Sequence, residues 1–332
     1  MLTLGIETSC DDTGLALLEG SRNVLAEVLS SQTEIHAPYG GVVPEVASRM
    51  HEEKFLPLLI KLLESAQIKD PSKEIGLIAV TVGPGLMGSL LVGVMSAKGL
   101  AQAWGVPMVG VNHLEGHIFA NVMAHENLCP PFLSMVVSGG HTEIYLVRDY
   151  GDYELLGKTR DDAAGECYDK VAKILGLSYP GGPVIDKLAQ KGDPLAFKFP
   201  VPLSSSNEVE FSFSGLKTAV LWTIKKLKAE GKFLPIEDLC ASFQKAVVAS
   251  LLGKVRLAVK KTGIKKVAIS GGVSANSGLR AALKEDGEIE AFIPPIRMCT
   301  DNGAMIAAAG FSKYMRGEVD KLDINPNPSL RL

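Results

Sequence analysis

The sequence predicts an α/β protein, and three observations carry that prediction. Runs rich in β-branched residues alternate along the chain with helix-like runs, as in folds that pack helices on a sheet. The 332 residues include 34 glycines but only 2 tryptophans, which favours many tight strand-to-helix turns. A strand–turn–strand pattern near the N-terminus returns in mid-chain and suggests a duplicated unit.

Length and composition limit the class of protein further. A chain of 332 residues corresponds to about two domains of typical size. Its shares of hydrophobic (46%) and charged (21%) residues are those of a globular protein, which excludes wholesale disorder. The net charge of −3 neither indicates nor excludes a nucleic-acid partner.

The first part of the chain is predicted to be a β-hairpin followed by alternating helices and strands. The hairpin comprises residues 2–8, a polar turn at 10–14 that contains two aspartates, and residues 15–20. The elements expected next are helices over 45–68, 89–104 and 113–124 and buried strands over 75–82 and 106–111.

The pattern restarts after residues 129–131, which is the candidate domain boundary. Residues 132–149 indicate strand, glycine-containing turn and strand, in the shape of the first hairpin. Residues 265–283 indicate strand, glycine turn and helix. Residues 298–315 indicate a helix with Thr300 or Asp301 near its N-cap.

Two features bear on location. The five cysteines (Cys10, Cys129, Cys167, Cys240 and Cys299) are scattered and include no CxxC pair, which indicates a reducing cytoplasm rather than a disulfide framework. No signal peptide fits the N-terminus, which lacks a basic segment and carries acids early.

Residues 75–97 are uncharged and long enough to suggest a transmembrane helix. The Gly83-Pro84-Gly85 sequence in the middle divides this stretch into a buried strand and a glycine-rich helix. We therefore expect no membrane span here.

His113 and His117 are candidate metal ligands. Residues i and i+4 lie on one face of a helix, so both imidazoles can reach one ion. The alternative is two histidines on a polar helix surface. Glu115 projects away from their shared face and the spacing is not HExxH, so a zinc-protease mechanism is not supported.

The segment Gly83–Gly88 matches G-x-G-x-x-G between a strand and a helix, which is a dinucleotide-binding pattern. No acidic residue follows until Glu115, well past the position where a ribose-binding acid is expected. We therefore interpret the segment as a tight turn with close strand–helix packing.

Two further strands end in Ser-Gly-Gly, within Val136–Thr142 and Ile269–Asn276. Such glycine pairs let backbone N–H groups approach an anion. Together with the aspartates of the first hairpin they suggest loops from two lobes around a nucleotide. The segment Tyr179–Asp186 adds glycine backbone and an acid, whereas Asp169 on a helix-like segment is also explained as a solvent-facing acid.

These motifs, in this order, resemble the family of tRNA N6-adenosine threonylcarbamoyltransferases (TsaD), formerly known as O-sialoglycoprotein endopeptidases (Gcp). The matching segments cover nearly the whole chain and are GIETSCDDT, GGVVPEVASRMH, GPGLMGSLLVG, NHLEGH, VSGGHTE, DDAAGE, YDKVAKILGL, YPGGP, FSFSGLKTA, SGGVSAN and CTDNGAMIA.

The resemblance implies the fold of the actin/sugar-kinase/Hsp70 ATPases (ASKHA), with two RNase-H-like lobes and a nucleotide between them. The implied N-terminal lobe comprises residues 1–128 and about 297–332 and carries the metal site. The implied C-terminal lobe comprises residues 129–296 and carries the nucleotide and substrate loops.

The resemblance also implies the site residues. The metal ligands are His113, His117 and Asp301, the last of which spacing alone does not select. The implied substrate- and nucleotide-binding residues are Val136, Val137, Ser138, Gly139, Gly140, Asp169, Gly182, Asp186 and Asn276. Asp11 and Asp12 are candidates for a catalytic role that remains open.

Three positions depart from the commonest family pattern. Asp12 stands where glutamate is frequent, and Cys167 and Gly303 stand where alanine is frequent. The shorter carboxylate of Asp12 bears on any general-base assignment.

The implied reaction moves a threonylcarbamoyl group from its adenylate to N6 of adenosine 37 in tRNAs that read ANN codons, and AMP leaves. One divalent metal is expected per chain, Fe²⁺ first and Zn²⁺ or Mg²⁺ as alternatives. The implied partners are tRNA, a TsaB-like paralogue and a TsaE-like small ATPase, in the cytoplasm and without a membrane.

Two other hypotheses stay open on the sequence. One is a metalloprotease, as the older family name implies, and the other is a small-molecule kinase or a nucleotide-sensing module of the ASKHA fold. The acid-free stretch 239–284 contains Lys254, Arg256, Lys260, Lys261, Lys265 and Lys266. It is either a track for tRNA phosphates or a solvated helix face.

Overall fold

The computed structural model describes residues 1–332, which form two compact units. Unit 1 consists of Met1–Asn127 and Pro294–Leu332, and unit 2 consists of Leu128–Ile293. The elements of unit 1 are β1 (Leu2–Glu7), β2 (Asp12–Glu19), β3 (Asn23–Ser31), α1 (Thr33–His36), η1 (Ala37–Tyr39), α2 (Pro44–Ser65), α3 (Pro71–Glu74), β4 (Leu77–Gly83), α4 (Met87–Trp104), β5 (Met108–Asn112), α5 (His113–Ala124), η3 (Ile296–Met298) and α11 (Gly303–Met315).

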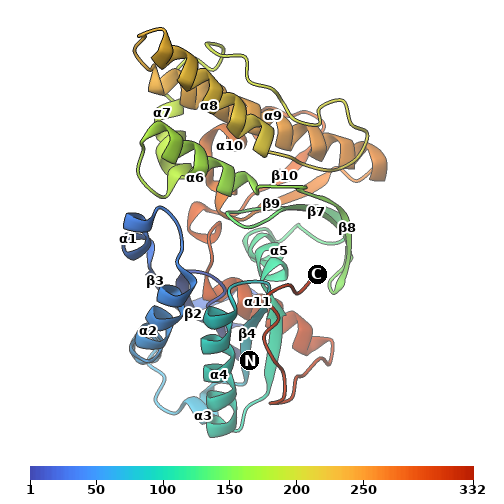
Figure 1. Ribbon diagram of the computed structural model, residues 1–332. Coiled ribbons are helices and arrows are strands. Elements are labelled where there is room, and N and C mark those ends of the chain that lie inside the picture. Colours follow the sequence, from blue (N-terminus) through green and yellow to red (C-terminus); the bar gives the residue numbers. More distant parts are fainter. The chain divides into compact units, whose positions relative to one another are not determined.

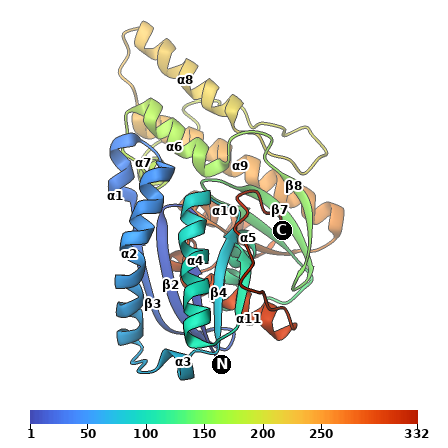
Figure 2. The ribbon, with the colours of Figure 1, turned by 60° about the horizontal axis from the view of Figure 1, so that its bottom comes forward.

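The sheet of unit 1 has the strand order β3-β2-β1-β4-β5. Strands β1 to β3 pair antiparallel, whereas β1, β4 and β5 pair parallel. Helices α2 and α4 lie side by side and pack on this sheet, as Figure 2 shows. The C-terminal helix α11 packs against β1, β2 and α5, so the two ends of the chain share one core (Figure 1).

The predicted elements of unit 1 form because their residues suit the environment. All seven residues of β4 and all five of β5 are buried, which explains why both strands are apolar except for Thr81 and Asn112. The predicted hairpin is confirmed, with Glu7 paired to Gly14 beside the turn. The uncharged stretch 75–97 is divided between β4 and α4, and none of the helices has the length and apolar character that crossing a membrane requires.

The predicted tight turn between β4 and α4 is confirmed. A side chain at Gly85 would meet the backbone of Ser9, and one at Gly83 would meet the backbone of Asn327. The N–H of Leu86 donates to the carbonyl of Ser9 over 2.8 Å. These glycines therefore serve close packing of the turn against neighbouring backbone.

Unit 2 repeats the plan of unit 1 with its own strands. Its sheet has the order β10-β9-β6-β7-β8, in which β6 to β8 pair antiparallel and β6, β9 and β10 pair parallel. Read in reverse, as β8-β7-β6-β9-β10, this order and its strand directions match β3-β2-β1-β4-β5 of unit 1. The elements are β6 (Phe132–Val137), β7 (Thr142–Asp149), β8 (Asp152–Lys158), α6 (Ala164–Leu175), α7 (Gly181–Ala189), α8 (Ser214–Ala229), α9 (Ile236–Thr262), β9 (Lys266–Ser270), η2 (Gly272–Ala275), α10 (Ser277–Glu285) and β10 (Glu290–Phe292).

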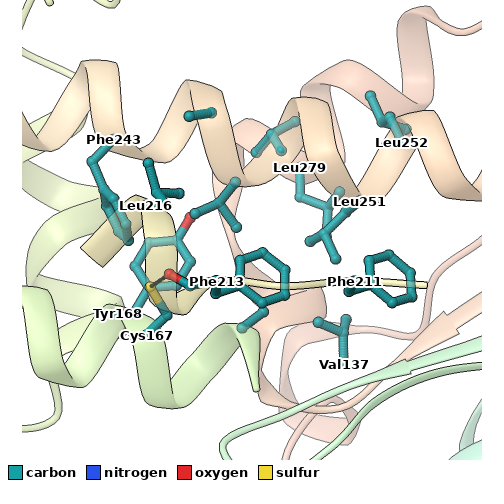
Figure 3. Close-up of a cluster of buried hydrophobic side chains, with 14 of the residues drawn as sticks. Val137, Cys167, Tyr168, Phe211, Phe213, Leu216, Phe243, Leu251, Leu252 and Leu279 are labelled. Atoms are coloured by element: carbon teal, nitrogen blue, oxygen red, sulfur yellow. Dashed lines mark hydrogen bonds between the residues drawn. The ribbon is translucent and has the colours of Figure 1, made fainter. Parts of the chain in front are cut away.

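The core of unit 2 lies between its sheet and the long helix α9. Aromatic rings fill much of it: Tyr168 meets Phe243 edge to face at 5.1 Å, and Phe211 stacks on Phe213 at 6.4 Å between ring centroids. Cys167 lies in the same cluster, as Figure 3 shows, and burial raises the pKa of its thiol to about 12. This residue is therefore a packing residue of the core.

Candidate metal centre and nucleoside-binding cluster

The first two metal-ligand candidates lie on the first turns of α5. Asn112 caps this helix, because its side chain accepts from the N–H of Leu114 over 2.8 Å. His113 and His117 follow one turn apart, and both side chains are buried. Their rings meet edge to face with centroids 4.7 Å apart, so the predicted shared face is confirmed.

Asp301 comes from the far end of the sequence, just before α11. The N-cap of α11 is neither Thr300 nor Asp301, as the sequence suggested, but Asn302, whose side chain accepts from the N–H of Met305 over 2.8 Å. The amide of Asn302 also donates to the carbonyl of Thr300. Asn302 therefore provides the cap, and the carboxylate of Asp301 lies beside the two histidines.

The three side chains converge closely enough to share an ion. Asp301 Oδ1 lies 3.6 Å from His113 Nε2 and 3.2 Å from His117 Nε2, and one ligand atom from each residue lies within 4.8 Å of the others. Two ligands at about 2.1 Å from one ion stand about 3–4 Å apart, which these separations nearly match. We call this candidate site, formed by His113, His117 and Asp301, the metal centre.

The chemistry of His117 fits a metal. Its side chain is fully buried, and neither ring nitrogen makes a hydrogen bond, even though Nε2 is close to Asp301. A buried nitrogen without a partner costs about 1–3 kcal/mol, so a ligand that uses it is expected. Two imidazoles and one carboxylate suit a divalent ion and leave further coordination positions open.

Glu7, at the end of β1, orients His113. Its Oε2 lies 3.0 Å from His113 Nδ1 and accepts from Thr81 Oγ1 over 2.6 Å, while its Oε1 accepts from the N–H of Ser9 over 2.6 Å. A carboxylate on Nδ1 fixes the ring and directs Nε2 to the metal. Sequence analysis missed Glu7, although an acid that ends an apolar strand was a detectable signal.

Charges in the metal centre shift its pKa values in opposite directions. Burial would raise the pKa of Glu7, but the facing His113 outweighs burial and the net pKa is lowered. Burial would lower the pKa of His113, but Glu7 and Asp301 together raise it to about 9. Glu7 therefore stays ionised, and the protonated imidazole of His113 compensates its charge.

The aspartate turn of the first hairpin is fixed by a buried histidine from α2. His51 Nε2 donates to the carbonyl of Cys10 over 3.0 Å, which leaves Nδ1 to accept from Thr13 Oγ1 over 2.7 Å. Between these anchors lie Asp11 and Asp12. Burial, aided by Asp301 and Asp11, raises the pKa of Asp12 to about 7.

In unit 2 the two Ser-Gly-Gly turns lie side by side, because β6 and β9 are parallel neighbours with Val136 opposite Ser270. A side chain at Gly139 or Gly140 would meet nothing within 4 Å, and neither residue has a positive φ. Gly271, by contrast, has φ +88° and packs against the backbone of Val137. The fold thus requires glycine at 271 but not at 139 and 140, which leaves close approach of a ligand as a reason for them.

The other residues implied for the nucleoside also lie in unit 2, on α6, on α7 and at the cap of α10. Asp169 on α6 accepts from the N–H of Gly181 over 2.7 Å, at the start of α7, where a side chain at Gly182 would meet nothing within 4 Å. Asp186 accepts from the hydroxyl of Ser277 over 2.7 Å and from Gln244 over 2.9 Å.

Asn276 completes a group of three linked residues (Asp186, Gln244 and Asn276), a candidate site that we call the nucleoside cluster. Its amide donates to Gln244 Oε1 over 2.7 Å, and its carbonyl caps α10 by accepting from the N–H of Leu279. The hydroxyl of Tyr168 also reaches Gln244 over 3.4 Å. Gln244 lies in the middle of α9, and no motif in the sequence pointed to it.

Sequence comparison gives consistent matches. The model of the family "TsaD: tRNA N6-adenosine threonylcarbamoyltransferase" matches residues 23–308. The protein of that name from Dictyoglomus turgidum is 52% identical over 335 residues, which cover 100% of this chain and 99% of that protein. The protein of that name from Thermosipho africanus is 50% identical over 336 residues and covers both chains fully.

Solved structures resemble the fold at low sequence identity. The (R)-2-hydroxyglutaryl-CoA dehydratase component A of Acidaminococcus fermentans matches 95% of this chain and 99% of its own, with a TM-score of 0.57 and 18% identity. Full-length HypF matches 95% of this chain with 55% of its own, with a TM-score of 0.61 and 15% identity. Both have ASKHA folds, so the predicted fold class is confirmed.

Proposed function

This chain belongs to the family of tRNA N6-adenosine threonylcarbamoyltransferases, and we propose that it performs that family's reaction on tRNA. The threonylcarbamoyl group moves from threonylcarbamoyl-adenylate to N6 of adenosine 37 in tRNAs that read ANN codons. A C–N bond forms, the bond between the carbonyl carbon and the phosphate oxygen breaks, and AMP leaves with that oxygen. The observation that carries the proposal is the metal centre with Glu7 behind it.

The metal centre is proposed to hold one divalent ion through His113, His117 and Asp301, with Fe²⁺ first and Zn²⁺ or Mg²⁺ as alternatives. When bound, such an ion supplies Lewis-acid polarisation of phosphate or carbonyl oxygens. Glu7 holds His113 in the tautomer that presents Nε2 to the ion.

Unit 2 is proposed to bind the adenylate. Gly139 and Gly140 are exposed and carry no side chain, so their backbone N–H groups would be the donors to an anion. Asp169, Gly182, Asp186 and Asn276 would recognise the nucleoside. Because hydrogen bonds already fix Asp186 and Asn276, this part of the site is ordered before the substrate arrives.

The attacking amine must lose a proton, and Asp12 is proposed to accept it. Its pKa of about 7 places the carboxylate near the pH of the cell, where a general base works best. His51 anchors the turn on either side of this residue, through the carbonyl of Cys10 and the hydroxyl of Thr13. Asp11 remains the second candidate at the same turn.

A protein partner is supported by an exposed apolar surface on the paired helices α2 and α4. Leu56 and Ile60 of α2 are 60% and 49% exposed, and Leu91 and Met95 of α4 are 47% and 56% exposed. Such surfaces mark protein interaction sites. We propose a TsaB-like paralogue and a TsaE-like ATPase as partners, in the cytoplasm, where the five cysteines would stay free thiols as they are here.

The metalloprotease alternative is less well supported. The acid nearest to the histidines in sequence, Glu115, is buried and directed to Arg316 at 3.8 Å rather than to the metal centre. Glu7, which does reach His113, has both oxygens engaged by Ser9 and Thr81. A kinase of the same fold finds no specific support in these residues.

The deciding experiment is transfer of labelled threonine to tRNA by the complete mixture of this chain, the paralogue, the small ATPase and a source of threonylcarbamoyl-adenylate. We expect N6-threonylcarbamoyladenosine by mass spectrometry, little multiple turnover when any component is omitted, and none with Asp301→Ala. Unlabelled tRNA together with metal-dependent cleavage of glycoproteins by the purified chain would instead establish the protease.

A further inference from the structure

Unit 2 contains a cavity of about 640 Å³ that belongs to neither site described above. The loop 201–207 forms one wall, and a flank of α9 from Ala249 to Lys260 forms the other. The turn after α9, with Gly263 and Lys265, and Glu288 close the ends. Its volume is within the range of sites that hold a nucleotide-sized group.

An unpartnered hydroxyl lies in the wall of this cavity. Ser250, on α9, is only 3% exposed, and its Oγ makes no hydrogen bond within the protein. Buried hydroxyls in native proteins nearly always have a partner, because an unsatisfied one costs stability. A ligand that enters the cavity would supply that partner.

The opposite wall is held in place by a buried lysine. Lys254 is 4% exposed, and its Nζ donates to the carbonyls of Ser206 and Glu208 over 3.0 Å and 2.8 Å. The ammonium thus ties the loop to α9 through backbone groups. Lys254 forms no ion pair, although Glu208 and Glu210 lie near enough to interact with its charge.

The charged side chains at the rim of the cavity are mostly positive. Lys260 and Lys265 are exposed, line the cavity and form no ion pair. The acids nearby are already engaged: Asp286 pairs with Arg256 over 2.8 Å, and Glu208 with Lys261 over 3.4 Å. Glu288 is the one acid among the lining residues, against four cations.

The basic residues of the stretch 239–284 differ in burial and in ion pairing. Lys254 is internal, Arg256 is neutralised by Asp286, and Lys266 begins β9. Lys260 and Lys265 keep uncompensated charge at the cavity mouth. The stretch is therefore a local basic cavity with two free cations rather than a continuous track along α9.

We propose that this basic cavity binds the phosphate backbone of the tRNA substrate, with Lys260 and Lys265 on the phosphates and Ser250 Oγ as a hydrogen-bond donor at its wall. The inference rests on the proposed function, since tRNA is the polyanion which that reaction requires. Exposed lysines at an open rim suit a long polyanion, which extends beyond the cavity, better than they suit a small enclosed nucleotide.

The test is equilibrium binding of a fluorescein-labelled tRNA transcript with an ANN-reading anticodon to the full-length chain, by anisotropy from about 25 to about 200 mM NaCl. Lys260→Gln with Lys265→Gln should weaken binding and lower the slope of log affinity against log salt by about two. The matched control is Lys69→Gln with Lys321→Gln, which removes the same charge from exposed lysines of unit 1 and should leave slope and affinity unchanged.

Ser250→Ala separates a binding role from a structural one. It should weaken tRNA binding about tenfold, as expected for one lost hydrogen bond to a charged group. The melting temperature should not fall, because the hydroxyl has no partner inside the protein. A hydroxyl that served the fold would instead lower the melting temperature and leave affinity alone, which would contradict the proposal.

Three further outcomes overturn the inference. One is that the wild-type chain shows no salt-dependent binding of tRNA at about 25 mM NaCl. Another is an unchanged slope in the double lysine variant. The third is calorimetry with inorganic phosphate or AMP in which Ser250→Ala weakens the small anion but not tRNA. If wild-type chain in the complete mixture forms no N6-threonylcarbamoyladenosine, it is the proposed function that fails, whatever the binding result.

Discussion

In the metal centre of unit 1, both ring nitrogens of His117 are buried without a hydrogen bond, and Asp12 Oδ1 nearby is buried in the same way. In the nucleoside cluster of unit 2, Asp186 accepts from Ser277 and Gln244, and Asn276 is bonded on both sides of its amide. The metal centre thus contains polar atoms without hydrogen bonds, whereas the polar groups of the nucleoside cluster bond to one another.

This difference indicates two ways of preparing a site. Buried nitrogen and oxygen atoms without hydrogen bonds lower the stability of the folded state, and binding of an ion would compensate for this loss. A self-bonded cluster is ordered without ligand and costs the fold nothing. We therefore expect substitutions in the metal centre to abolish metal binding without lowering the stability of the metal-free fold. Substitutions near the nucleoside cluster should instead change ligand affinity without changing the fold.

The largest effect is expected from the ligands themselves. Wild-type protein should contain about one metal per chain by plasma mass spectrometry, and His113→Ala with His117→Ala should release it. Threonylcarbamoyl transfer should fall by at least about a hundredfold, since Lewis-acid stabilisation amounts to several kcal/mol. Stoichiometric metal in the purified double variant would show that the metal centre is assigned wrongly.

His117→Leu sharpens the same comparison. It should abolish metal binding, yet the metal-free variant should melt no lower than metal-free wild type, because no hydrogen bond is lost. A large drop in melting temperature would mean that His117 serves the fold, which would remove the contrast between the units.

Glu7→Gln should have the next largest effect. Loss of the carboxylate behind His113 typically lowers metal affinity about 10- to 100-fold, measured by competition with a chelator. Glu115→Gln is the matched control: it removes another buried carboxylate beside the histidines that is directed to Arg316. Equal losses in both variants would indicate a general effect of charge rather than orientation of His113.

Gly139→Val tests access to unit 2. The added side chain meets no protein atom, so the fold should persist, while backbone approach by a ligand is blocked. Calorimetry should show AMP or ATP affinity lowered by about tenfold or more. Gly215→Ala on α8, which is equally open, should leave affinity unchanged. Unchanged affinity in folded Gly139→Val would reject this placement of the nucleotide.

The smallest effect concerns pH and Asp12. Its pKa is about 7 in the folded chain against 3.8 ordinarily, so between those values the folded state holds a proton that the unfolded state has released. Stability must therefore fall as pH rises through this window. In metal-free protein, Asp12→Asn should remove that slope and raise the melting temperature at pH 8 by a few degrees over wild type. Asp149→Asn, an exposed control, should reproduce wild type.

The sequence by itself determined the strands that are buried on both faces and the local spacing of ligands. β4, β5 and β6 are predominantly apolar runs in which every residue is buried, and such runs are visible without a structure. His113 and His117 share a face because helix geometry alone puts residues four apart together. Family resemblance added Asp301, which no local pattern selects, and gave Asp169 and Asp186 a role that their local segments left open.

Other elements escaped the sequence because their signals are weak or depend on distant partners. β3 and β8 are edge strands with mostly exposed or half-exposed residues, so their apolar pattern is faint. The cap of α11 was placed one or two residues early, since Thr300, Asp301 and Asn302 are all good caps and only backbone geometry distinguishes them.

Tertiary structure alone decided which polar residues meet. Glu7 reaches His113 across 106 positions, and Gln244 joins Asp186 and Asn276 across 58 and 32. Propensity and periodicity act over a few residues, whereas these contacts depend on how strands and helices pack. A buried carboxylate or amide is stable only where such packing brings it a partner, so its role is fixed by the fold rather than by its neighbours in sequence.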